Sequence, residues 1–254
     1  MSYVIAIINQ KGGVGKSTTA HALATGLTLR GFRVLAIDME PQGNLSYSFG
    51  AEPEGLSVFD LLNGHPAGDT IQRTMQGEII ASATSLNGAD ISFIETGKEY
   101  RLREALLPIK SNFDYIVIDT PPALGILAIN ALTAADGAIV PALADIFSVQ
   151  GIGQLYSTIT AVRRYTNPQL VVLGILLTRY SSRSILARDI AEMLEDTAKE
   201  LQSNVFNARI REAVAVREAQ ASQQSLFAYA AKSTAAQDYQ ELIDELLALD
   251  QKKY

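Results

Sequence analysis

The chain of 254 residues has no cysteine and no tryptophan, and its only histidines are His21 and His65. Without a thiol it cannot form a disulfide, a cysteine-ligated zinc or iron–sulfur site, or a cysteine nucleophile. With only two histidines, a histidine-rich metal site is also disfavoured. Stability must therefore come from an apolar core, and a chain of this length with 48% hydrophobic residues is long enough to bury one.

Long apolar runs are missing as well. No stretch reaches the ~18 uncharged apolar residues of a membrane-spanning helix. The first residues, 1–8, carry no basic leader and are typical of a buried strand rather than of a signal peptide. We therefore expect a cytoplasmic protein with no membrane partner.

An excess of positive charge is also absent, since 21 basic residues face 27 acidic ones and the net charge is −6. Proteins that coat nucleic acid as monomers are usually basic, and this chain is not. The charge argues against indiscriminate nucleic-acid binding by the whole surface.

Short runs of Val, Ile and Leu alternate with amphipathic stretches along the chain. Such runs suit strands that are buried on both faces of a parallel sheet. The alternation predicts an α/β fold with a doubly wound, mostly parallel sheet and helices on both faces, as one domain over residues 1–254. Gly50–Gly88 reads as an irregular surface excursion. The predicted strands are Tyr3–Ile8, Arg33–Ile37, Ile91–Ile94, Tyr115–Ile118, Gly137–Pro141 and Val171–Leu177; the predicted helices are Ser17–Gly31, Glu99–Lys110, Ile126–Ala135, Gln150–Tyr165, Ser184–Gln202 and Thr234–Leu249.

A glycine-rich loop with a Lys-Ser pair joins the first strand to the first helix. Glycines let backbone N–H groups surround phosphate oxygens, and the helix N-terminus adds positive potential. Lys16 is placed to reach the β- and γ-phosphates, and the Ser17 hydroxyl to bind Mg²⁺. The motif departs from the usual P-loop, because Gln10 stands where a glycine is usual. The predicted nucleotide-binding residues of the loop are Lys11, Gly12, Gly13, Val14, Gly15, Lys16, Ser17 and Thr18.

Carboxylates follow two of the predicted strands. Asp38 and Glu40 come after the second strand, and Asp119 ends the apolar run 115–118 in a Walker B arrangement. Doubly wound sheets bind ligands at the carboxyl ends of their strands, so all three face the expected phosphate site. Asp119 is predicted near Mg²⁺, directly or through water.

The loop resembles the deviant Walker A motif of the ParA/MinD group of ATPases, whose signature lysine falls at Lys11. Residues 38–44 resemble the group's D-x-D-P-Q-G-N motif, with Glu40 where the family has Asp. Residues 99–106 match its E-Y-R-L-R-E-A-L helix. The chain is most similar to the short ParA/Soj-type partition ATPases. Because the P-loop begins near the start, no N-terminal helix-turn-helix domain is expected.

This resemblance implies a slow ATPase with ATP and Mg²⁺ as cofactors. It implies an ATP-bound homodimer in which Lys11 reaches the partner's phosphates, Asp38 helps to hold Mg²⁺ beside Ser17 and Asp119, and Glu40 positions the attacking water. Since the extra methylene of Glu40 displaces its carboxylate, slowed hydrolysis is expected. Further nucleotide contacts are expected from Asn44, Thr178 and Arg179.

The resemblance further implies non-specific DNA binding by the dimer, a ParB-like partner that stimulates hydrolysis, partition of plasmid or chromosomal DNA, and association with the nucleoid. Arg183, Arg211 and Arg217 are the candidate DNA-binding residues. A MinD-like ATPase that acts at a membrane or on another cargo is the alternative, but the C-terminal segment 240–254 is mostly acidic, and anionic lipid would repel it. An iron–sulfur electron carrier is excluded because the chain has no cysteine. A GTPase is disfavoured because the chain has no Asn/Thr-Lys-x-Asp motif. A P-loop kinase would need a pocket for the phosphate acceptor, and the sequence does not reveal one.

Overall fold

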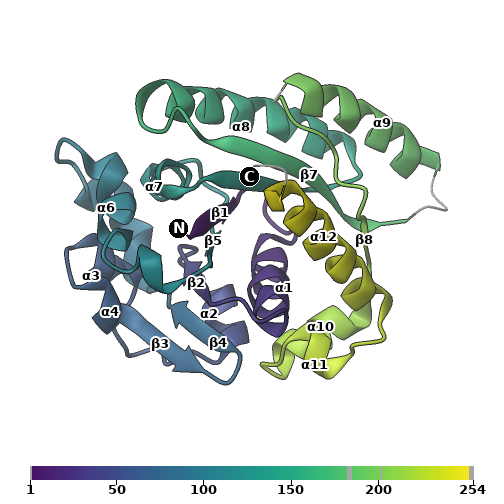
Figure 1. Ribbon diagram of the computed structural model, residues 1–254. Coiled ribbons are helices and arrows are strands. Elements are labelled where there is room, and N and C mark those ends of the chain that lie inside the picture. Colours follow the sequence, from purple (N-terminus) through teal and green to yellow (C-terminus); the bar gives the residue numbers. More distant parts are fainter. Residues whose placement is uncertain (1, 182–184, 201, 252–254) are drawn as a thin grey trace.

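A computed structural model describes residues 2–181, 185–200 and 202–251, and its centre is one eight-stranded sheet (Figure 1). The strand order is β3-β4-β2-β5-β1-β6-β7-β8, and only β3 runs antiparallel to its neighbour. The predicted mostly parallel sheet is confirmed. The strands are β1 (Tyr3–Ile7), β2 (Val34–Asp38), β3 (Ile71–Thr74), β4 (Gly77–Ile80), β5 (Tyr115–Asp119), β6 (Gly137–Leu143), β7 (Val171–Tyr180) and β8 (Ile210–Arg211).

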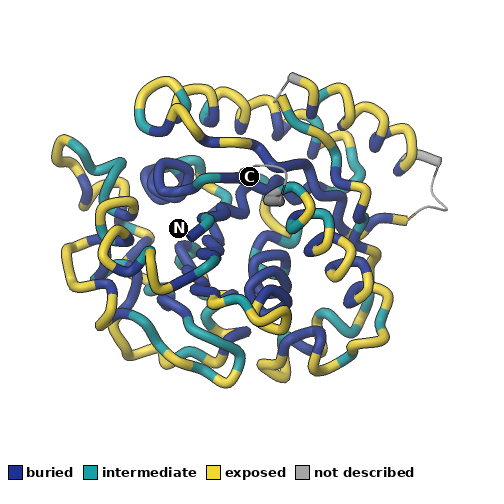
Figure 2. The backbone as a smooth tube through the Cα atoms, viewed as in Figure 1, coloured by how far each residue is buried: buried dark blue, intermediate teal, exposed yellow. Residues whose placement is uncertain are grey.

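Successive side chains along each strand point to opposite faces of the sheet and pack into two apolar cores, one on each face. On β1, Val4 and Ala6 enter one core, while Ile5 and Ile7 enter the other. The strands and the inner sides of the helices are buried, as Figure 2 shows. The core around Val4 is covered by α3 (Val58–Leu62), α4 (Ala67–Thr70), α5 (Ala89–Ser92), α6 (Arg101–Leu106), α7 (Ile126–Ala134), α8 (Ile146–Tyr165) and α9 (Ile185–Glu200).

The opposite core is covered by helices from both ends of the chain (Figure 1). In this layer, α1 follows the first strand and packs against the last helix of the chain. The helices are α1 (Lys16–Leu29), α2 (Asn44–Phe49), α10 (Val214–Ala221), α11 (Leu226–Tyr229) and α12 (Thr234–Gln251); short 3₁₀ turns lie at η1 (Thr84–Gly88), η2 (Lys98–Tyr100) and η3 (Lys110–Asn112). Among the residues that the structure describes, no helix is long and apolar enough to cross a membrane.

Two expectations for the region before α6 were wrong. The predicted strand Ile91–Ile94 is the end of α5 followed by irregular chain, because only Phe93 of the run is buried, whereas Ile91 is 84% exposed and Ile94 is 76% exposed. Gly50–Gly88 is more than a surface excursion, since it supplies β3 and β4 at the sheet edge. The backbone of β4 pairs with that of β2, which places this segment at the edge of the sheet. Backbone hydrogen bonds of this kind do not require a particular pattern of side chains.

Some element boundaries also differ from the prediction. The predicted helix Glu99–Lys110 is α6 between the turns η2 and η3, and α8 begins four residues before the predicted Gln150. Asp145 caps α8, because its carboxylate accepts a hydrogen bond of 2.8 Å from the Ser148 amide. The two-residue strand β8 was not predicted.

Candidate nucleotide-binding site

The loop between β1 and α1 has the conformation of a phosphate cradle. Gly13 and Gly15 have φ angles of 73° and 86°, in the left-handed region that glycine adopts without strain. The first helical hydrogen bond of α1 runs from the Thr19 amide to the Gly15 carbonyl. The amides of the residues between them are therefore left at the helix N-terminus, where an anion is stabilised by N–H groups and the helix dipole.

Polar side chains hold this loop from both sides. The Asn9 side chain donates to the Pro141 carbonyl at 2.7 Å and accepts from the Lys11 amide at 3.0 Å. The Thr178 hydroxyl at the end of β7 donates to the Val14 carbonyl at 2.8 Å. Thr178, expected to contact the nucleotide, thus fixes the shape of the loop, which the sequence did not indicate.

Lys16 is buried at the base of the loop, with its ammonium 3.2 Å from the Lys11 carbonyl oxygen. Burial lowers the pKa of Lys16, and the negative charges of Asp119 and Glu40 oppose that shift. A buried ammonium that has few protein partners is well suited to bind phosphate oxygens.

Asp38 and Asp119 occupy paired register positions at the carboxyl ends of the adjacent strands β2 and β5, and both are fully buried. Oδ2 of Asp38 accepts from the amide and the hydroxyl of Ser46, each at 2.7 Å, and Oδ1 accepts from the Glu40 amide at 3.1 Å. Burial raises the pKa of Asp38 to about 6, and these hydrogen bonds limit the rise.

Asp119 is the less satisfied of the two, because neither of its carboxylate oxygens has a hydrogen-bond partner. Burial, followed by the charge of Asp38, raises its pKa well above the usual range, while Ser17 and Lys16 oppose the rise. An unpartnered buried carboxylate beside a serine hydroxyl fits a hard cation such as Mg²⁺. The described residues include no cluster of three or more His, Asp or Glu ligands, so such an ion would also need oxygens from phosphate or water.

A cavity of about 380 Å³ lies in front of these groups and is lined by Gly12, Lys16, Ser17, Glu40 and Asn44 among others. The Gln42 amide donates to the Glu40 carboxylate at 3.3 Å, and the Asn44 side-chain amide donates to the Gln42 side chain at 3.4 Å. The structure thus brings Glu40, Asn44 and most of the predicted loop residues to one cavity, whereas Lys11, Val14 and Asp38 do not line it.

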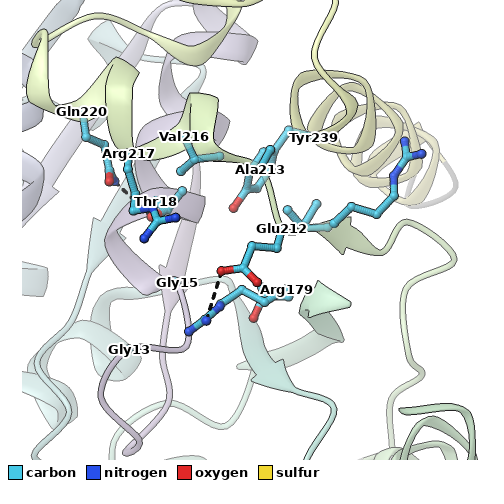
Figure 3. Close-up of a pocket in the computed structure, with 13 residues that line it drawn as sticks. Gly13, Gly15, Thr18, Arg179, Glu212, Ala213, Val216, Arg217, Gln220 and Tyr239 are labelled. Atoms are coloured by element: carbon cyan, nitrogen blue, oxygen red, sulfur yellow. Dashed lines mark hydrogen bonds and ion pairs between the residues drawn. The ribbon is translucent and has the colours of Figure 1, made fainter. Parts of the chain in front are cut away.

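A second cavity of about 220 Å³ lies on the other side of Thr18 (Figure 3). Arg179, with a left-handed φ of 50°, forms an ion pair of 3.1 Å with Glu212 at this cavity. The Gln220 side chain of α10 donates to the Thr18 hydroxyl at 3.0 Å and lines both cavities. The sequence singled out neither Glu212 nor Gln220, because their approach to the loop depends on how the C-terminal segment packs on α1.

The three candidate DNA-binding arginines have different surroundings. Arg217 is exposed on α10 and lines the second cavity. Arg211 is bound to the buried Asp238 of α12, with Nε 3.0 Å from both carboxylate oxygens, so it joins β8 to α12. Arg183 lies outside the described residues.

Lys11 lies at the front of the loop and makes an ion pair within its own chain. Its ammonium is 2.6 Å from Oδ2 of Asp145 and lies over the ring of Phe147, 5.7 Å from the ring centroid. Asp145 was missed at the sequence level, where nothing indicated that the start of α8 meets the loop.

The fold and this site define the class: a P-loop nucleotide-binding protein with a doubly wound sheet. A protein family described as AAA domain matches residues 2–172. The sporulation initiation inhibitor protein Soj of Bacillus subtilis is 36% identical over 98% of this chain and 99% of its own length, and the chromosome partitioning protein ParA of Caulobacter vibrioides is 37% identical over 98% of this chain and 96% of its own. The chain belongs to the Soj/ParA family of partitioning ATPases.

Solved structures agree with this fold. A Mycobacterium smegmatis protein with bound ADP and magnesium, named cobyrinic acid a,c-diamide synthase, has a TM-score of 0.86 and 35% identity over 100% of this chain and 97% of that one. The McdA protein of Cyanothece has a TM-score of 0.87 at 23% identity over 97% of this chain and 100% of that one, and supports the fold alone.

Proposed function

We propose that this protein is a DNA-partitioning ATPase that binds ATP with Mg²⁺, dimerises, and in that state binds DNA without sequence preference. The proposal rests chiefly on one observation: Asp119 is buried and unpartnered beside Ser17 and Lys16, directly behind a loop shaped to hold phosphates. The structural relative from M. smegmatis that has 35% identity was solved with ADP and magnesium, which supports the choice of ligands.

Different residues of the chain bind the phosphates, hold the metal ion and position the attacking water. The loop amides and the Lys16 ammonium bind and orient the phosphates, and the Ser17 hydroxyl and Asp119 hold the metal side of the site. Bound Mg²⁺ supplies charge neutralisation to the phosphate oxygens. Asp38 fixes the start of α2 through Ser46 and its carboxylate also faces the metal, while Glu40 orients the attacking water.

Lys11 completes the site of a second copy. We infer that ATP brings two chains together face to face and that each Lys11 stabilises the charge that develops on its partner's γ-phosphate, as an arginine finger does. Homologues named for chromosome partitioning support a DNA cargo. From the family resemblance we further propose a ParB-like stimulating partner and a place on the nucleoid in the cytoplasm.

Light scattering coupled to size exclusion, together with fluorescence anisotropy on an arbitrary duplex, tests this proposal with ATP, with ADP and without nucleotide. We expect dimers and DNA binding only with ATP, and DNA affinity that falls steeply between about 50 and 200 mM salt. Lys16→Ala should bind neither nucleotide nor DNA. Lys110→Ala, which removes a lysine paired with Asp136 away from the loop, is the matched control and should behave like the wild type.

Three results would overturn the proposal. Tight ATP binding by Lys16→Ala would contradict the assignment of the loop. DNA binding that is sequence-specific or independent of salt would contradict the backbone-contact mechanism. ATP turnover that required a carboxylic-acid acceptor and an ammonia donor would favour amide synthesis, the activity for which the M. smegmatis relative is named.

A further inference from the structure

The helix α10 has few buried apolar side chains. Of its eight residues only Ala219 is fully buried, while Ala215 and Val216 are partly buried against the core. A helix with so little apolar anchoring has a position that depends on a few polar contacts.

Two of those contacts lie at its C-terminal end. Gln220 donates to the Thr18 hydroxyl at 3.0 Å, and the carbonyl of Gln223, just beyond the helix, accepts at 2.8 Å from the side chain of Gln76 in the turn between β3 and β4. The second contact ties the corner after α10 to the sheet edge. The first ties the helix itself to the phosphate-binding loop.

Gln220 stands between the two cavities that meet at Thr18. It lines the cavity of the phosphate loop and also the cavity of Arg179 and Arg217 (Figure 3). Arg217 is one helical turn before Gln220, is exposed, and lines the second cavity itself. A nucleotide that extends from the first cavity into the second would therefore lie next to both side chains of α10.

We propose that Gln220 is a nucleotide-positioning residue that couples the occupancy of the phosphate loop to α10. Binding of ATP orders Thr18, the Thr18 hydroxyl holds Gln220, and α10 with Arg217 becomes fixed against α1. This inference rests on the proposed ATP binding, and it adds a residue and a helix that respond to the nucleotide.

Hydrogen exchange of the α10 amides, measured by mass spectrometry with and without a non-hydrolysable ATP analogue and Mg²⁺, tests the coupling. We expect the nucleotide to slow exchange across 214–221 by about tenfold in the wild type and by less than about twofold in Gln220→Ala, because one hydrogen bond accounts for roughly a tenfold change in an equilibrium. Gln220→Leu should behave like the alanine variant, since its side chain of similar size can neither donate to nor accept from the Thr18 hydroxyl.

The matched control is Gln224→Ala, which removes an exposed glutamine four residues away and should retain the full wild-type response. Nucleotide affinity is measured in parallel by titration with a fluorescent ATP. Gln220→Ala that binds ATP and still shows tenfold protection of α10 would overturn the proposal, as would a wild type that binds ATP without protecting α10. Failure of the wild type to bind ATP would instead overturn the proposed function, and the coupling with it.

Fluorescence anisotropy on duplex DNA then distinguishes coupling of α10 to the bound nucleotide from a purely local packing role of Gln220. The ratio of DNA affinities with ATP and with ADP should fall by about tenfold in Gln220→Ala, whereas a side chain that only supports local packing would leave that ratio unchanged.

Discussion

The ammonium of Lys11 and the carboxylate of Asp145 are 2.6 Å apart in the same chain, although 134 positions separate the two residues in the sequence. The pair is partly exposed, with 28% and 35% of the respective side chains accessible. A lysine that is proposed to reach a partner's phosphates must first leave this carboxylate. The pair would therefore compete with the proposed dimer.

Asp145→Asn should strengthen ATP-dependent dimerisation by about two- to fivefold, because a partly exposed ion pair is worth about 1 kcal/mol at most. Asparagine keeps an oxygen that can accept from the Ser148 amide, so the cap of α8 is retained. Sedimentation velocity over a concentration series with ATP measures the change. Lys11→Ala should lose dimerisation and hydrolysis, and weaker dimerisation of Asp145→Asn would contradict the competition.

The buried carboxylates should make the stability of the nucleotide-free protein fall as pH rises. The pKa of Asp38 is raised from 3.8 to about 6 on folding, so the native state binds more protons than the unfolded state between these values. Up to about 3 kcal/mol of stability is therefore lost from pH 4 to pH 6 and beyond, if this group acts alone. Chemical denaturation at several pH values measures the slope.

Asp119→Asn tests how much a buried carboxylate destabilises the nucleotide-free protein. Removing an unpartnered buried charge should raise the melting temperature of the nucleotide-free protein at pH 7.5 and abolish the extra stabilisation that Mg²⁺ adds to ATP. Asp114→Asn, at the other end of the same strand, is the control: the Arg33 side chain lowers the pKa of Asp114 to about 2, so its loss should lower the melting temperature. Undiminished stabilisation of Asp119→Asn by Mg²⁺ with ATP would refute the metal-site assignment.

Glu40 is predicted to act on the chemical step. Glu40→Gln should lower kcat by about 10- to 100-fold with little change in ATP affinity, since a neutral amide cannot orient and activate water as a carboxylate does. Glu40→Asp restores the shorter acid of the family motif and should raise kcat. Single-turnover hydrolysis with parallel binding titrations separates the two effects, and an unchanged rate in Glu40→Gln would remove Glu40 from the mechanism.

A backbone prediction concerns Gln223, which adopts a φ of 49° in the left-handed region. Its side chain is exposed, and its carbonyl contact to Gln76 does not need a side chain. Gln223→Gly should stabilise the fold by about 0.5–1 kcal/mol, because relief of left-handed strain outweighs the added entropy of the unfolded chain. Gln224→Gly, which relieves no such strain, should destabilise by a similar amount. Urea denaturation compares the two.

The sequence by itself determined the features that depend on local pattern. Apolar runs such as 3–8 and 115–118 predicted parallel strands because burial on both faces demands continuous apolar side chains. The glycines and the Lys-Ser pair of the loop, with the acids at the strand ends, predicted a phosphate and metal site because these groups are adjacent in any doubly wound sheet. The resemblance in those motifs led to the family that the comparisons show.

Tertiary structure alone decided the contacts between segments that are distant in sequence. The pairing of Lys11 with Asp145 and the contact of Gln220 with Thr18 depend on helix packing, which no local pattern encodes. The sheet edge β3–β4 formed where the sequence predicted a loop, and Ile91 and Ile94 proved exposed rather than buried. In each case the outcome depended on which partner groups lie nearby in space, and that is settled only when the whole chain folds.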